Sequence, residues 1–253
     1  MIWDLQKASI WKRVSAFLLD MIILGIIAVL FALIISAVSG YDSKSSELQA
    51  RYDALENKYG ITFQISNDDY QALFEEKRSM YDKAYQELNA DHAAVLLYHQ
   101  IMNITIMTVS LSLLSAFLIV EFAVPMIMKN GQTVGKKVFG IAVMHANGVR
   151  VTPVAMLTRT LLGKYAIETM VPALIILMIY FNTIGIVGVV VIGLIAVLQA
   201  VLMIATKTNS MIHDVLSNTV VVDMASQLIF DTQQQMIEFK KAAAAEQAER
   251  QKY

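Results

Sequence analysis

Two carboxylates and one amide interrupt long apolar stretches of the sequence. Asp20 lies within the run from Val14 to Val38, Glu121 lies within the run from Ile101 to Met128, and Gln199 lies near the end of a third apolar region. A charge at the centre of a bilayer costs about 2.5–3.5 kcal/mol on insertion scales. Such side chains therefore face protein or water, and they often serve ions or protons.

The three residues are predicted to share one depth in the membrane. Each lies seven or eight residues from a basic residue at the edge of its apolar run, which a helix converts into about 10–12 Å. Asp20 and Glu121 could share a proton or hold a hard cation, with Gln199 lining the site, because neighbouring like charges raise one pKa. In the alternative, basic residues pair with the two carboxylates and only fix helix positions.

The composition excludes several other kinds of site. The chain has no cysteine, so disulfides, thiolate zinc sites and cysteine catalysis are excluded. His145 and His213 are isolated and lack metal-ligand spacing. No grouping of serine, histidine and carboxylate supports catalysis either. We therefore expect no metal, no cofactor and no enzymatic activity.

The elements that must position these side chains are membrane helices. Of the 253 residues, 57% are hydrophobic, and the mean hydropathy is +0.55. About 20 apolar residues cross a bilayer, and the sequence predicts four such spans: 14–38, 101–128, 165–181 and 184–205, with a turn at Asn182-Thr183 between the last two. A cleaved signal peptide is the alternative for the first segment, but its length and Asp20 argue against that reading.

Charge predicts the orientation of the spans. The stretch 129–164 carries six Lys or Arg and no Asp or Glu, whereas the connection 41–100 carries six basic and eleven acidic residues. The positive-inside rule therefore places the N-terminus and the 129–164 loop in the cytoplasm. Four spans return the C-terminus to the same side, and three spans would place it outside.

The hydrophilic connection 41–100 is predicted to form an extracytoplasmic helical hairpin. Gly60 is a natural end for the first arm, and Ser66 with Asp69 is a capping signal for the second. An apolar stripe marks each arm: Leu48, Tyr52, Leu55 and Tyr59 in the first, and Tyr70, Phe74, Tyr81, Tyr85 and Leu88 in the second. We expect the two stripes to pack together, and recognition of an external partner is the alternative.

The cytoplasmic segments have a different character. A strand-like stretch, 138–144, precedes the turn signal Asn147-Gly148 and the short stretch 149–151, which predicts a small β-hairpin. An interfacial amphipathic helix over 154–168 would follow, with Arg159 and Lys164 reaching toward headgroups. The chain thus divides into 1–40, 41–100, 101–128, 129–164, 165–206 and 207–253, the last segment containing a helix over the hydrophilic tail from Met224.

A glycine-containing stretch, 131–137, looks superficially like a phosphate-binding loop. It has three residues between its glycines rather than four, and Lys137 stands where Ser or Thr is required. We therefore expect no nucleotide and no nucleic acid as ligand. The same stretch resembles a motif of the RDD family of bacterial membrane proteins, together with residues before the first span and after the fourth. The matching residues are Arg13, Asp20, the stretches 131–136 and 140–143, Arg159, His213, Asp214 and the stretch 219–221, and within 131–136 they include Gly131, Thr133, Gly135 and Lys136.

The resemblance covers about 7–40 and 101–223, and Val134 stands where proline is common in similar proteins. It implies a multi-pass protein of the bacterial cytoplasmic membrane, with Arg13 and Asp214 as a structural ion pair. Two functions fit: a cation- or proton-coupled transporter, or a membrane scaffold or assembly protein that does not transport. Because four spans enclose little volume, we expect a homo-oligomer or a membrane partner within the lipid bilayer.

Overall fold

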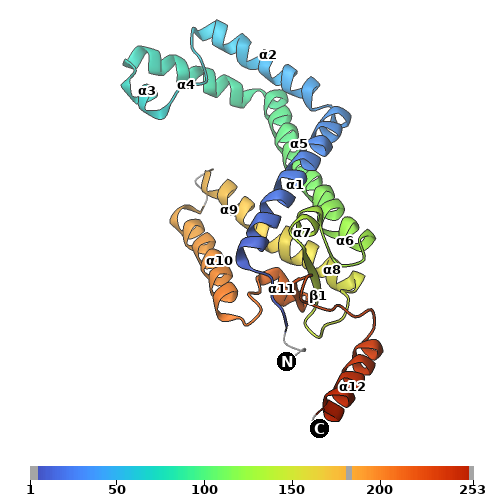
Figure 1. Cartoon of the computed structure of the whole chain (residues 1–253). Helices are drawn as coiled ribbons and strands as arrows, with labels where there is room; N and C mark the ends of the chain where they lie inside the picture. Colours follow the sequence, from blue (N-terminus) through green and yellow to red (C-terminus); the bar gives the residue numbers. More distant parts are fainter. Residues whose placement is uncertain (1–4, 181–183, 251–253) are drawn as a thin grey trace. The chain divides into compact units, whose positions relative to one another are not determined.

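A computed structural model describes residues 5–180 and 184–250 of the chain (Figure 1). Within these residues, four helices are long and apolar enough to cross a membrane: Ile10–Ser39 (α1), His92–Ile127, Pro153–Ile179 and Gly185–Ala205 (α10). The predicted fold, an all-α membrane protein of four spans with a small sheet, is confirmed. The predicted turn at Asn182-Thr183 lies outside the described residues.

The second and third of these helices each contain a π-helical stretch. The second span consists of α5 (His92–Phe117), η1 (Leu118–Ala123) and α6 (Val124–Ile127), and the third region of α8 (Pro153–Leu157), η2 (Thr158–Met170) and α9 (Val171–Tyr180). π-Helical turns are rare and are frequent at functional sites. Here they carry charged side chains, with Glu121 in η1 and Arg159 and Lys164 in η2.

The predicted helix over 154–168 is present and leads into the third span, but the prediction for its basic side chains is wrong. Thr152 caps the helix, its side chain accepting from Ala155 N–H at 3.3 Å, and the chain then stays helical from Pro153 to Tyr180. Arg159 does not reach toward headgroups but is 2% exposed. A buried carboxylate draws its guanidinium inward, because an ion pair in the protein interior replaces the hydration that the charge loses.

The chain divides into two compact units, and Val29–Ser112 is one of them. Besides the end of α1 and most of α5, it contains α2 (Tyr41–Tyr59), α3 (Asn67–Ala72) and α4 (Glu75–Ala90). Gly60 ends α2 in the left-handed conformation (φ 63°), and the Ser66 side chain accepts from Asp69 N–H at 3.1 Å, so both predicted caps are confirmed. α2 and α4 pack together around a core of Leu48, Leu88, Ala94 and Leu97.

The second arm of this hairpin differs from the prediction of one continuous helix. The chain is extended at Leu73 and Phe74, which separates α3 from α4. The Phe74 side chain is 86% exposed and lies outside the packed stripe. α4 then starts with Glu75 and Glu76 in its first turn, where negative charge favours the positive end of the helix dipole.

The other unit, Met1–Ala28 with Leu113–Tyr253, contains the sheet. Strand β1 (Ile141–His145) pairs antiparallel with β2 (Thr219–Asp223), with Val143 opposite Val221. The predicted turn at Asn147-Gly148 is present, but 149–151 is not the partner strand. It contributes only isolated bridges, such as that between Met144 and Arg150.

The pairing follows from burial. Both faces of β1 are covered, and the apolar run of β2 buries three consecutive valines against it: Val220, Val221 and Val222. The short stretch 149–151 offers less apolar surface. The chain before α1 also joins the sheet, since Ala8 N–H donates to the Val221 carbonyl at 3.1 Å. The sheet therefore ties the start of the first span to the segment after the fourth.

Three shorter helices complete this unit. α7 (Val134–Val138) precedes β1, and α11 (Ile212–Leu216) precedes β2. The tail helix α12 (Gln233–Arg250) is confirmed, but it begins at Gln233 rather than near Met224. Phe239 lies on Phe230, with ring centroids 5.3 Å apart.

Candidate functional site

Asp20 is held by the loop that carries the glycine motif. Its carboxylate accepts hydrogen bonds from Gly135 N–H at 2.7 Å and from the Thr133 hydroxyl. Thr133 also caps α7, so the loop and the helix start are built around this one buried carboxylate. A Cβ at Gly135 would lie 2.8 Å from Asp20 Oδ1 and would overlap the Ala16 carbonyl. Only glycine allows α7 to approach α1 so closely.

Gly131 is required for a different reason. Its φ of 62° is in the left-handed region, and a Cβ there would lie 2.6 Å from the Val143 carbonyl oxygen. The loop therefore turns tightly against β1 before it reaches Thr133.

Lys136 lies between Asp20 and Glu121, the two carboxylates that were predicted to share a site. Its Nζ lies 3.4 Å from Glu121 Oε2 and 3.7 Å from Asp20 Oδ2, and it donates to Thr133 Oγ1 at 3.1 Å. A second cation, Lys164, lies 2.5 Å from Glu121 Oε1. Burial lowers the pKa of Lys136 to about 8, even though Glu121 acts to raise it. Asp20 and Glu121 do meet, with an ammonium group between them.

A second cluster surrounds Asp214. Arg13 NH2 lies 2.8 Å from Asp214 Oδ2, which confirms the predicted ion pair. Arg159 pairs with the other carboxylate oxygen and also donates to Thr219 Oγ1 at 2.7 Å. Burial acts to raise the pKa of Asp214, but Arg159, His213 and Arg13 hold it well below its usual range.

These two clusters contain most of the charged and polar residues through which the sequence resembles a known family, namely Arg13, Asp20, Thr133, Lys136, Arg159 and Asp214. A model of the RDD family matches residues 7–218. The chain belongs to the RDD family. Comparison with curated proteins and with solved structures gave no match.

Gln199 does not join the layer of Asp20 and Glu121 in this RDD protein. Its amide donates to Glu168 Oε1 at 3.1 Å and accepts from Ile212 N–H at 3.0 Å. Glu168 in turn contacts His213 Nδ1, with 2.7 Å between Oε2 and the ring nitrogen. Burial lowers the pKa of His213. These side chains fasten α11 to the third and fourth spans.

The sequence did not predict that two residues, Lys164 and Glu168, take part in the buried network. Glu168 was assigned to an interfacial helix, and Lys164 was expected among headgroups. The signal that could have found them is their spacing, because Lys164 and Glu168 are four residues apart. Such spacing places both charges on one side of a helix, where they can face the same partners.

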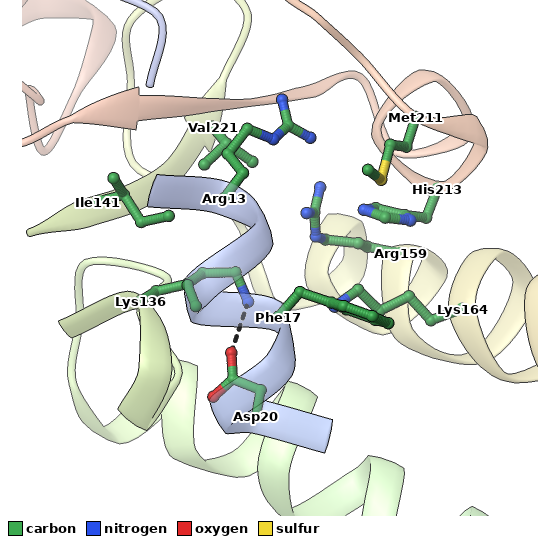
Figure 2. A pocket seen from close by; sticks show the side chains of 11 residues that line it. Arg13, Phe17, Asp20, Lys136, Ile141, Arg159, Lys164, Met211, His213 and Val221 are labelled. Atoms are coloured by element: carbon green, nitrogen blue, oxygen red, sulfur yellow. Dashed lines mark ion pairs between the residues drawn. The ribbon is translucent and has the colours of Figure 1, made fainter. Parts of the chain in front are cut away.

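The RDD protein also has a cavity of about 50 Å³ beside these clusters (Figure 2). Charged side chains from α1, α7 and η2 reach it, and apolar side chains form much of the remaining wall. Its charged and polar lining consists of Arg13, Asp20, Lys136, Arg159, Lys164 and His213. Among the described residues, no group of three or more His, Cys, Asp or Glu could hold a metal ion.

Proposed function

We propose that this RDD family member exchanges protons for a monovalent cation across the bacterial cytoplasmic membrane. The observation that carries the proposal is the position of Lys136 between carboxylates of two different spans. Its ammonium group has the charge and the oxygen partners that an alkali cation would take, because such hard cations prefer oxygen ligands. The lysine and the cation therefore compete for Asp20 and Glu121.

The protonation behaviour of Lys136 supports this competition. With a pKa of about 8, the lysine loses its proton at a small cost near neutral pH. Neutral Lys136 leaves Asp20 and Glu121 short of one positive charge, and the incoming cation replaces it. One proton leaves for each cation that binds, so the charge of the site stays constant.

Orientation and assembly belong to the same proposal. The basic loop 129–164 and the acidic connection 41–100 favour cytoplasmic termini under the positive-inside rule. Four spans enclose little volume, so a homo-oligomer or a membrane partner would complete the path for the ion.

The test is ion flux in proteoliposomes made from the purified chain, with Na⁺, K⁺ and H⁺ gradients measured separately. We expect cation-dependent proton movement in the wild type and its loss in the Asp20→Asn, Glu121→Gln double variant. Lys136→Met should abolish proton coupling. Lys137→Met is the matched control, since Lys137 is the exposed neighbour of Lys136, and it should transport as the wild type does.

Two results would overturn the proposal. Normal flux in the double variant would remove the site from the transport path. Absence of flux for all three ions in the wild type would favour the scaffold function instead. In that case, a chain in which a short linker replaces 42–95 should lose its partner in a pull-down.

A further inference from the structure

The cavity beside the two clusters is lined unevenly by charge. Four cationic side chains reach its wall: Arg13, Lys136, Arg159 and Lys164. Of the carboxylates that pair with them, Asp20 lines the cavity, whereas Glu121 and Asp214 are not part of its lining. The wall of the cavity therefore carries more cationic than anionic side chains. The apolar wall strengthens this effect, because a low local dielectric screens charges weakly.

Arg159 lines this cavity, and one of its hydrogen-bond donors is unused among the described residues. Its side chain is 2% exposed, and NH1 is occupied by Asp214 and Thr219. Within the described part of the chain, Arg159 Nε has no hydrogen-bond partner. A buried donor of a charged group without an acceptor is costly. Since Arg159 lines the cavity, an acceptor in the cavity would satisfy it.

We propose that this cavity binds one small monovalent anion, such as chloride, between Arg13 and Arg159. The volume of about 50 Å³ leaves room for a small ion, because a cavity volume of about 10–15 Å³ is enough to hold one water molecule. Figure 2 draws Arg13, Arg159 and His213 together on one side of the cavity and the Lys136–Asp20 pair on the other. The anion position between the two arginines therefore differs from the cation position at Asp20 and Glu121, although Asp20 and Lys136 line the same cavity, and it does not depend on transport.

The test is equilibrium binding of radioactive chloride to the purified full chain in detergent, followed by scintillation proximity. The wild type should bind chloride saturably, with one site per chain. Bromide and nitrate should compete for this site, and the bulkier gluconate should not.

Arg159→Lys tests the spare donor. Lysine keeps a positive charge for Asp214 but lacks the Nε–H group, so chloride should bind about tenfold more weakly, as expected for one lost hydrogen bond to a charged group. Arg150→Lys is the matched control, because Arg150 pairs with Asp231 at 2.6 Å near the surface. It should bind chloride as the wild type does.

Ala16→Leu tests the space without altering a charge. Ala16 is buried and lines the cavity, so the larger side chain should abolish chloride binding. Ala200→Leu, at an exposed position of α10, is its control and should leave binding unchanged. If the wild type shows no saturable binding, or if Ala16→Leu binds as well as the wild type, the cavity holds water and the proposal is wrong. Neither result would bear on the flux measurements.

Discussion

Replacement of Gly135 by alanine tests the contact on which the whole site depends. In the structure, Gly135 N–H donates to Asp20 Oδ1 at 2.7 Å. A Cβ at this position would lie 2.8 Å from the same oxygen and would overlap the carbonyl of Ala16. The Ala16 oxygen belongs to the backbone of α1, so it cannot turn aside as a flexible side chain would. α7 must therefore move away from α1.

Two effects set how much stability the Gly135→Ala variant should lose. Loss of a hydrogen bond to a charged acceptor costs about 1.5–3 kcal/mol. Insertion of a carbon into a packed interface costs a further amount of about 1–3 kcal/mol. Gly135→Ala should therefore reduce the free energy of unfolding by about 2.5–6 kcal/mol. Gly25→Ala is the matched control, because Gly25 lies within α1 and a Cβ there would meet nothing within 4 Å.

The assay is heating of the purified variants in detergent, followed by size-exclusion chromatography of the protein that stays monodisperse. Gly135→Ala should lose its monodisperse peak well below the wild-type temperature. Gly25→Ala should match or exceed the wild type, since alanine is favoured over glycine inside a helix by up to about 1 kcal/mol. Equal stability of the two variants would refute the close packing of α7 on α1.

Three further predictions concern other parts of the network. The apparent affinity for the transported cation should fall about tenfold per pH unit below pH 8 and level off above it. The reason is that protonated Lys136, with its pKa of about 8, excludes the cation. Measurement of cation binding at a series of pH values tests this. The double charge swap Arg13→Asp with Asp214→Arg should not raise the folded yield above that of the single reversals. The arginine placed at position 214 would face Arg159, and an unbalanced buried charge costs about 3–5 kcal/mol. Leu88→Ala should destabilise the helical hairpin by about 2–5 kcal/mol and speed its limited proteolysis.

Each of these has a control or a contrary outcome. A pH-independent affinity would separate cation binding from the lysine. For the charge swap, Lys12→Asp with Asp223→Lys is the control. That pair, at 2.6 Å, is partly exposed, so its double swap should recover the folded yield. Recovery of the folded yield by the swap of Arg13 and Asp214 would contradict the sharing of Asp214 with Arg159. Leu96→Ala, at a position 61% exposed, should leave proteolysis unchanged, and an equal rate for both leucine variants would argue against the hairpin core.

Features that depend only on neighbouring residues could be predicted before the structure was known. The spans follow from the length and hydropathy of single segments. The helix stop at Gly60 and the cap at Ser66 follow from backbone sterics and one local hydrogen bond. The ion pair of Arg13 and Asp214 came from a different source, a motif resemblance, because no local rule joins residues so far apart in the chain.

Contacts between distant side chains depend on long-range packing, which local patterns do not predict. β1 pairs with β2 rather than with the stretch beside it, because the long-range pairing buries more apolar surface. Gln199 contacts Glu168 rather than Asp20, although helix rise gives Gln199 and Asp20 similar depths. Depth is a local property of one helix, whereas contact also requires the rotation of each helix about its axis. The packing of all the spans together sets that rotation, and it is what placed Lys136 between the two carboxylates.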